Sequence, residues 1–278
     1  MVTTELILLG TGTPNLNPSR YQSSLVIIAD GQPYVVDCGG GTMQRIARAR
    51  DQFQLDALAM TKLNRLFLTH LHPDHTTGLP DFLIGPWVLD REDRVEVYGP
   101  QGTQTLVDGV LAAYEVGIAE HRDGLAPIDH PLTVDTSPIQ EGKVYQDDAI
   151  LIEAFPASHG GLEAYSFKCT TADKTIVISG DTCPTDAMLA YAKGCDVLVH
   201  EVYSAERFKH RSPEWQRYHS QVHTSTIELA EIAKATRPGL LVPVHQLFWG
   251  ASEAELLAEV TSRYDGEVIS GHDVMRVL

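Results

Sequence analysis

The residues best suited to chemistry lie in one short stretch, His70-Leu-His72-Pro-Asp74-His75. It places three imidazoles and one carboxylate directly after the apolar run Leu66–Leu68, which is typical of a buried strand. Imidazole and carboxylate ligands without thiolate suit zinc, manganese or iron in hydrolytic or oxidative sites. The stretch therefore predicts a metal site. It holds too few ligands for two metals, so further ligands must come from later in the chain.

Three later residues have the same placement, because each follows an apolar, strand-like run: His159, Asp181 and His245. With them the ligand count is sufficient for two metals. One predicted set is His70, His72 and His159. The other is Asp74, His75 and His245. Asp181 would bridge the two metals, and two cations about 3.5–4 Å apart would activate a hydroxide near neutral pH.

The elements that must position these ligands are predicted to be strands in the first part of the chain and alternating strands and helices in the rest. Glu5–Leu9, Ser24–Ile28 and Pro33–Val36 read as strands, and Asp30-Gly31 predicts a hairpin between the last two. We expect an α+β fold in which two sheets pack together with helices outside. No Gly/Ser/Pro-rich linker divides the chain, so residues 1–278 are predicted to form one domain.

The segment at about 116–142 lacks periodic apolar residues, and we expect it to be irregular. It is interpreted as a lid or a substrate-shaping insertion, with a plain surface excursion as the alternative.

The amino-acid composition limits the classes of binding partner and the cellular compartment that we expect. The formal net charge of −16 opposes binding to a phosphate backbone, so a small molecule is favoured over a nucleic acid as partner. The four cysteines form no CxxC pair, which fits a reducing compartment. No apolar run is long enough to cross a membrane, and the N-terminal residues do not resemble a signal peptide. A cytoplasmic location is expected.

The ordered motif set resembles the metallo-β-lactamase superfamily. It consists of HxHxDH at 70–75, a downstream histidine, a strand that ends in Gly-Asp-Thr, and a late histidine after a strand. The resemblance covers essentially the whole chain. It implies a four-layer αββα sandwich with a dinuclear site at the open edge between the sheets, usually occupied by zinc, with manganese or iron as alternatives.

Finer features are similar to the ribonuclease Z branch: LLGTGTP at 8–14, YVVDCGGGT at 34–42 and SGDT at 179–182. Leu198–Val202 is similar to that branch's HEAT segment, and His223-Thr-Ser-Thr226 to its His-Ser-Thr segment. The resemblance implies that Glu201 and His223 form a catalytic pair in which His223 assists the leaving group. Asp74, with Asp181, would hold the attacking hydroxide. It also implies a homodimer.

One departure from that branch decides the expected substrate. A long basic arm that grips tRNA typically lies between the residues matching His159 and Asp181, and here two strands and a turn use up that interval. We therefore expect a hydrolase of small esters, with a phosphodiester slightly favoured over a lactone, carboxylic ester or aryl sulfate. The first alternative is a ribonuclease Z-like endonuclease that processes tRNA 3′ ends. The second is a di-iron redox member of the same fold.

Overall fold

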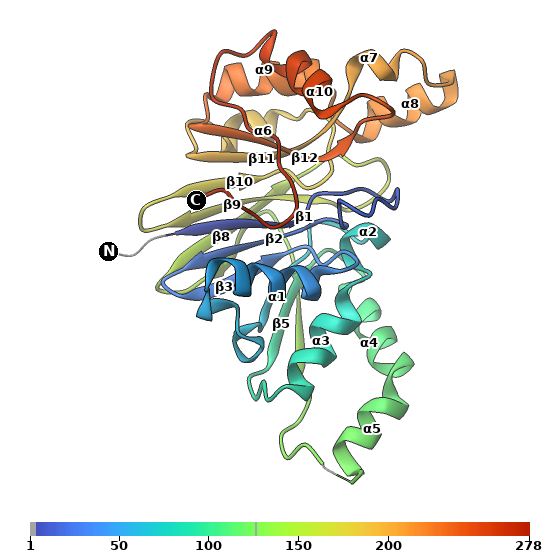
Figure 1. Cartoon of the computed structure of the whole chain (residues 1–278), viewed down its shortest axis with the longest axis vertical. Coiled ribbons are helices and arrows are strands. Elements are labelled where there is room, and N and C mark those ends of the chain that lie inside the picture. Colours follow the sequence, from blue (N-terminus) through green and yellow to red (C-terminus); the bar gives the residue numbers. More distant parts are fainter. Residues whose placement is uncertain (1–3, 126) are drawn as a thin grey trace.

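The computed structural model describes residues 4–125 and 127–278, and two sheets packed face to face form its centre (Figure 1). The first sheet has the strand order β13-β1-β2-β3-β4-β5-β6. These strands are β1 (Glu5–Gly10), β2 (Ser24–Ala29), β3 (Gln32–Val36), β4 (Arg65–Phe67), β5 (Val95–Gly99), β6 (Val134–Pro138) and β13 (Met275–Arg276). From β3 to β6 neighbouring strands run parallel, so their carboxyl ends lie at one edge.

The second sheet has the order β12-β11-β10-β9-β8-β7. Its strands are β7 (Gly142–Gln146), β8 (Ile150–Pro156), β9 (Tyr165–Thr171), β10 (Thr175–Ile178), β11 (Val197–Tyr203) and β12 (Leu240–Leu247). β10, β11 and β12 are parallel, and β9 is antiparallel to both β8 and β10. β8 and β10 therefore point the same way.

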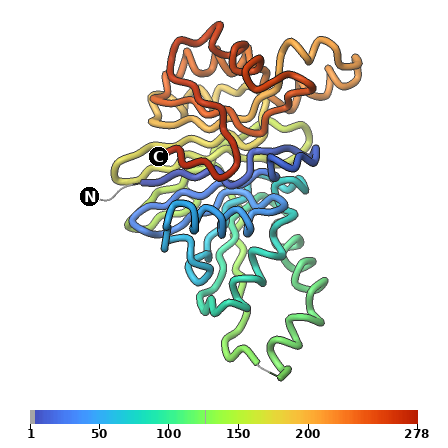
Figure 2. Tube along the Cα trace, viewed as in Figure 1, coloured from blue at the N-terminus to red at the C-terminus, as the bar shows by residue number. Residues whose placement is uncertain are grey.

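Helices cover the outer faces of both sheets (Figure 1). Those that follow strands of the first sheet are α1 (Thr42–Phe53), α2 (Pro73–Thr76), α3 (Leu79–Val88), α4 (Thr103–Ala113) and α5 (Glu115–Asp123), with short 3-10 turns at Asp56–Leu58 and Met60–Lys62. The second sheet carries α6 (Asp186–Tyr191), α7 (Ala205–Phe208), α8 (Pro213–Val222), α9 (Thr226–Thr236) and α10 (Glu253–Thr261). The colour sequence of the chain trace shows that each half of the chain builds one sheet with its helices, apart from the C-terminal strand (Figure 2).

Successive side chains along each strand point to opposite faces of the sheet and so belong to different apolar cores. In β1, Leu6 and Leu8 face the space between the sheets, whereas Ile7 and Leu9 pack under the helices on the outer face. A third apolar core lies between the second sheet and α6, α9 and α10. Because both faces are buried at strands such as β1, β2 and β11, these strands read as nearly continuous apolar runs. The predicted αββα sandwich is confirmed.

Several elements differ from the prediction. The segment at 116–142 is not irregular throughout, because it contains most of α5 and all of β6, which pairs with β5. The strand β7 and the helices α7 and α8 were not predicted. β6 and β7 lie at sheet edges, where half-exposed side chains give no apolar alternation. None of the described helices combines the length and the hydropathy that crossing a membrane requires.

Candidate metal centre

The predicted ligands meet at the edge where β4, β8 and β10 end. His70 and His72 lie in the loop after β4, His159 follows β8, and Asp181 follows β10. Their ligand atoms all lie within 4.8 Å of one another, and so do those of the set Asp74, His75 and His245. Strand ends thus bring residues that are far apart in sequence to one point, as expected for ligand sites at the carboxyl ends of parallel strands.

The short helix α2 turns the second half of the histidine motif inward. His72 is still extended, with φ −67° and ψ 150°, and Pro73 then opens the helix. The helix begins at Pro73 because proline is well suited to the first helical position. Asp74 and His75 therefore leave the loop on a different side from His70 and His72.

Two glycines allow the ligand loops to approach one another. A Cβ on Gly39 would lie 2.3 Å from the carbonyl oxygen of Asp74, and one on Gly180 would lie 2.9 Å from Cβ of Thr69. Gly180 also has φ +60°, which favours glycine. The loop after β3 therefore packs directly on α2, and the loop after β10 packs beside His70.

His245 is placed by an irregularity that the sequence did not reveal. The sequence places His245 after a strand-like run, but β12 continues past it to Leu247. The register against β11 shifts at this point: Glu201 pairs with Val244 and Val202 with Gln246, which leaves His245 as an extra residue with φ +43°. Such a β-bulge re-aims a side chain, here toward Asp74.

The first ligand set is three imidazoles whose free nitrogens converge. His70 Nε2 and His159 Nε2 each lie 3.1 Å from His72 Nδ1. His159 Nδ1 donates to the carbonyl oxygen of Val222 at 2.7 Å, so its Nε2 keeps a lone pair directed at the cluster. His70 Nδ1 lies 3.0 Å from the Thr69 hydroxyl, which donates to Asp37 and can therefore accept from His70.

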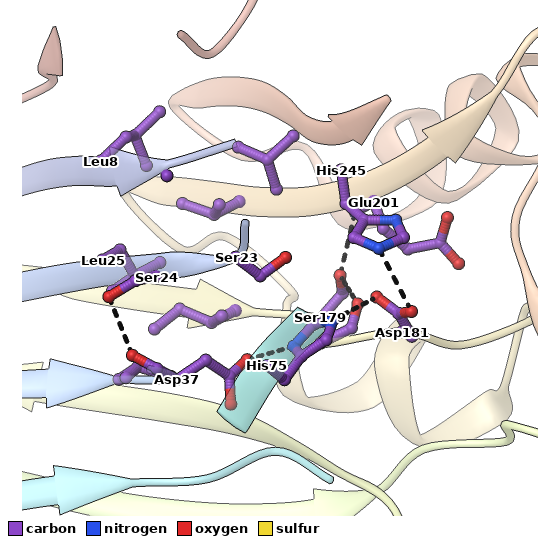
Figure 3. Close-up of a pocket in the computed structure, with 16 residues that line it drawn as sticks. Leu8, Ser23, Ser24, Leu25, Asp37, His75, Ser179, Asp181, Glu201 and His245 are labelled. Carbon is purple, nitrogen blue, oxygen red and sulfur yellow. Dashed lines mark hydrogen bonds and ion pairs between the residues drawn. The ribbon is translucent and has the colours of Figure 1, made fainter. Parts of the chain in front are cut away.

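The second set is tied to the first by Asp181. His245 Nε2 lies 3.2 Å from Asp74 Oδ2 and 3.5 Å from Asp181 Oδ2. His75 Nε2 lies 3.5 Å from Asp181 Oδ1, and its Nδ1 donates to Asp37 Oδ2 at 2.8 Å. Figure 3 shows Asp37, His75, Asp181 and His245 directed toward one another. Because Asp181 Oδ2 is also 3.8–3.9 Å from His70 and His159, this carboxylate reaches both sets.

These residues fit two divalent cations. Imidazole nitrogens on one tetrahedral zinc, at 2.0–2.1 Å each, lie roughly 3.3 Å apart, close to the separations in the first set. Among the described residues, the buried atoms His75 Nε2 and Asp181 Oδ1 have no hydrogen-bond partner. Buried polar atoms are normally satisfied, and a cation would satisfy both. Partners that hold the outer nitrogen of a histidine are typical of metal ligands.

The electrostatics favour the ligand-competent forms of the first set and of Asp181. Burial lowers the pKa of His70, His72 and His159, and neighbouring histidines add to the effect, so these rings are neutral. Burial alone would raise the pKa of Asp181, but the charges of His245 and His75 outweigh it and hold that pKa well below its usual range. Neutral imidazole and ionised carboxylate are the forms that bind metals. Burial would lower the pKa of His75 and His245 as well, but the charge of Asp181 outweighs it and raises both pKa values, so a cation would have to displace their protons.

Glu201 and His223 form a buried pair beside the centre. His223 Nδ1 lies 3.0 Å from Glu201 Oε1, which also accepts from the main-chain N–H groups of Thr182 and Thr224. Burial raises the pKa of Glu201, and burial lowers the pKa of His223 to about 4. The carboxyl group is therefore fixed by three contacts, and it fixes the orientation of the histidine ring.

A cavity of about 550 Å³ opens above the ligands. His72, Asp74, His159, Asp181, His223 and His245 line its floor. Its wall includes Arg211, Trp215, Tyr218 and His219, which the sequence did not single out for function, together with Trp249. Four of them lie at helical spacing from 211 to 219, which was the one available signal. None of the described residues between 116 and 142 lines this cavity, so the lid role of that segment stays a prediction.

Asp37 was also missed as part of the site. It lies in the loop after β3 with φ +57° and contacts both Thr69 and His75. The glycines at 39–41 marked a sharp turn near the site, but nothing in the sequence indicated which ligand this carboxylate would hold.

Comparisons with known proteins agree with this geometry. Residues 33–246 match the model of the beta-lactamase superfamily domain. A ribonuclease Z of Mycobacterium sp. (strain KMS) is 32% identical over 98% of this chain and 95% of its own length. The solved metallo-beta-lactamase fold protein YhfI from Bacillus subtilis is similar, with TM-score 0.76, 16% identity and 98% of both chains covered.

The short form of human tRNase Z is similar as well, with TM-score 0.71 and 22% identity over 99% of this chain and 98% of its own. The chain therefore belongs to the metallo-β-lactamase superfamily and is a metallo-hydrolase of that fold, with ribonuclease Z-like relatives along nearly its whole length.

Proposed function

We propose that this protein hydrolyses phosphodiester bonds of RNA, as a ribonuclease Z-like enzyme that acts on tRNA 3′ ends. The observation that carries the proposal is the similarity to proteins named ribonuclease Z at about 30% identity over nearly the full length of both chains. The two ligand sets and the Glu201–His223 pair supply the chemistry that such a reaction requires.

We propose further that two zinc ions occupy the ligand sets, with manganese or iron as alternatives. Two cations supply Lewis acidity and lower the pKa of a bound water. His70, His72 and His159 would hold one cation, and Asp74, His75 and His245 would hold the other. Asp181 contributes negative charge to both sets.

His223 is suited to give a proton to the departing oxygen. Its Nδ1 is held by Glu201, and the ring lines the cavity beside Asp181. An anionic phosphodiester beside the ring would raise the low pKa that burial imposes, and it would thereby favour a protonated imidazole where the leaving group needs a proton. Glu201 acts through His223, because it fixes the ring and shares its proton.

The absence of a long basic arm does not separate this chain from its relatives. β9 and β10 occupy the interval between His159 and Asp181, as the sequence indicated. Yet this chain covers 95% or more of the relatives named ribonuclease Z, which leaves no room in them for a long extra arm. The comparisons therefore favour the ribonuclease over the small-ester hydrolase that the sequence suggested first.

A small phosphodiester is the second candidate, because the net charge of −16 opposes a long polyanion. The decisive assay uses the zinc- or manganese-loaded protein on precursor tRNA with a 3′ trailer. Bis(4-nitrophenyl) phosphate and matched carboxylic ester, lactone and sulfate substrates run beside it. Endonucleolytic release of the trailer supports the proposal. Turnover of the small phosphodiester alone supports the second candidate, and turnover only of the other esters contradicts both.

Variants connect this activity to the centre. Asp181→Ala should lower kcat/KM on the cleaved substrate by at least about 100-fold, since even partners of metal ligands cost 10–100-fold. Asp148→Ala is the matched control, because Asp148 is exposed in the turn between β7 and β8, at the end of β8 opposite His159. Full activity of the Asp181 variant would contradict the two-cation site.

A further inference from the structure

The helix α8 presents rings and one cation to the cavity above the metal ligands. Arg211, just before the helix, and Trp215, Tyr218 and His219 on it recur at spacings of three to four residues, so they share one face. Arg217 lies on the exposed part of the same helix. In Figure 1, α7 and α8 extend beyond the edge of the second sheet, at the end of the molecule where α2 also lies.

The rings form a continuous path from the surface to the metal ligands. Trp215 stacks on His219 with centroids 5.5 Å apart, His219 stacks on His223 at 5.6 Å, and His223 stacks on His245 at 5.7 Å. Trp249 joins the path beside His219 at 4.6 Å. Trp215 is 49% exposed and Tyr218 42%, so two large rings are kept open to solvent beside the centre.

Arg211 is the positively charged residue in the wall of the cavity. Its guanidinium lies 5.1 Å from the ring centroid of Trp249 and 5.8 Å from that of Trp215. Among the described residues, the buried Nε of Arg211 has no hydrogen-bond partner. In a chain with 37 acidic and 21 basic residues, an arginine with an unsatisfied buried donor beside the active site indicates that an anion binds there.

Trp249 is held in place at a conformational cost. Its φ is +45°, a region that a bulky side chain rarely adopts. Contacts with Tyr203 at 5.4 Å and Phe208 at 6.4 Å fix the ring against β11 and α7. Strain of this kind persists where the surroundings impose it, and it gathers at ligand sites.

We propose that Trp215, Tyr218, His219 and Trp249 form a subsite that stacks one nucleobase next to the scissile phosphate, with Arg211 bound to a phosphate of the same substrate. The proposal rests on the phosphodiesterase function above. A flat base suits walls made of rings, because every base has a π face. The guanidinium within the subsite opposes a cationic ligand, and a purely apolar ligand would leave it unpaired.

Dinucleotides test the subsite directly. The metal-loaded protein is given ApA and two analogues in which one or the other base is replaced by hydrogen. The ratio of kcat/KM for ApA to that for one abasic analogue should be well above 1. In Trp249→Ala and in Trp215→Ala the ratio should fall by roughly 5- to 150-fold, the loss expected for one base–aromatic stack. Trp249→Phe keeps a ring and should retain most of the ratio.

Binding gives a second readout that does not need turnover. Two of the three tryptophans line the cavity, so AMP should quench the intrinsic fluorescence at concentrations at which ribose 5-phosphate does not. Arg211→Gln should weaken the binding of AMP at least tenfold, whereas Arg217→Gln, on the same helix but in solvent, should leave binding and activity unchanged.

The outcomes separate the two proposals. If the wild type cleaves no phosphodiester, the proposed function fails, and AMP quenching still tests the subsite. If it cleaves ApA and both abasic analogues equally well, the base subsite is wrong and the phosphodiesterase stands. Methyl 4-nitrophenyl phosphate is the third arm: losses in the tryptophan variants on this ester but not on ApA would show that an aryl leaving group, not a base, occupies the rings.

Discussion

Asp37 shows how much of the centre depends on residues outside the histidine motif. Its carboxylate accepts from the main-chain N–H and hydroxyl of Thr69 and from Nδ1 of His75, so it orients residues on both sides of the motif. Burial of this carboxylate beside two ligand loops would be costly without those three donors. Its position fixes which nitrogen of His75 faces Asp181.

Asp37→Asn should therefore weaken metal binding by about 10–100-fold, the usual cost of losing the partner of a ligating histidine. The amide can still accept from Thr69, but an N–H group would face the N–H of His75. Competition with a chromophoric chelator measures the affinity. Asp30→Asn is the control, because Asp30 lies exposed at the β2–β3 turn, where asparagine is tolerated. Equal affinities in both variants would remove Asp37 from the centre.

His200 gives a prediction on pH. It is fully buried, its Nδ1 donates to the carbonyl oxygen of Glu201, and burial lowers its pKa from 6.5 to about 4. Between pH 4 and pH 6.5 the His200 side chain is protonated in the unfolded chain but not in the folded chain. The free energy of unfolding is therefore unaffected above pH 6.5 and falls as the pH drops toward 4. The full difference is about 3 kcal/mol.

His200→Asn keeps a donor near the position of Nδ1 and should be less stable at pH 7. Its unfolding free energy should, however, fall by about 3 kcal/mol less than that of the wild type between pH 6.5 and 4. Urea unfolding of metal-free protein at several pH values measures this, since loss of metal then does not contribute. Parallel curves for the two proteins would contradict the assignment.

Among the elements, α3 is held by a buried arginine in the turn that follows it. Arg91 is 1% exposed, and its Nη1 and Nη2 atoms donate to the carbonyl oxygens of Leu63, Phe82 and Leu83 at 2.6–3.1 Å. The side chain thereby joins the end of the second 3-10 turn to the middle of α3. This contact supports the first sheet from outside and lies away from the centre.

Arg91→Met fills a similar volume but removes the donors to the carbonyl oxygens of Leu63 and Phe82, and no helical N–H group can replace the donor to Phe82 because residue 86 is proline. It should lower the free energy of unfolding by about 3 kcal/mol or more, because each unsatisfied buried group costs about 1–3 kcal/mol. Arg94→Met, three residues on, removes an exposed ion pair with Asp135 and should cost less than about 1 kcal/mol. Denaturant unfolding compares the two variants, and similar losses would show that the buried contacts are not the cause.

Elements differed in how readily the sequence revealed them. Strands buried on both faces, such as β1 and β2, read clearly because nearly every position after the first is apolar. The helices α9 and α10 begin with Ser-x-x-Glu capping boxes, a local signal. α8 was harder to predict because the face that recurs at helical spacing carries rings and charges instead of aliphatic side chains, and that face lines a cavity rather than a core.

At the scale of the whole molecule, the metals should stabilise the sandwich by joining its two sheets. The ligands come from loops after β4, β8 and β10 and from β12, so unfolding either sheet destroys the site. At 100 to 1,000 times the dissociation constant, bound metal contributes about 3–4 kcal/mol. Removing it with a chelator should lower Tm by about 5–15 °C for a chain of this size.

Calorimetry with and without chelator measures this shift, and elemental analysis confirms that the metal has been removed and identifies it. In Asp181→Ala the same treatment should move Tm much less, because the carboxylate shared by the two ligand sets is gone. An unchanged Tm in wild-type protein that has lost its metal would contradict the coupling between metal and fold. The homodimer stays a prediction from the resemblance.

The sequence by itself determined the ligand types and their chemistry. His70, His72, Asp74 and His75 are a local motif, and His159, Asp181 and His245 each follow an apolar run. Residue type and short-range pattern were therefore enough to predict all seven candidate ligands, which the structure brings close together. Glu201 and His223 came from the resemblance, and the structure brings them together at 3.0 Å.

Only the tertiary structure decided how those residues are aimed and what surrounds them. His245 reaches the centre through a bulge in β12, Asp37 holds His75 from a neighbouring loop, and α8 places Trp215 and Arg211 above the ligands. Each of these depends on strand register or on packing between residues far apart in the chain. A local sequence pattern specifies which side chain can bind a metal. The contacts that orient that side chain come from residues far away in the sequence, so the residues next to it do not reveal them.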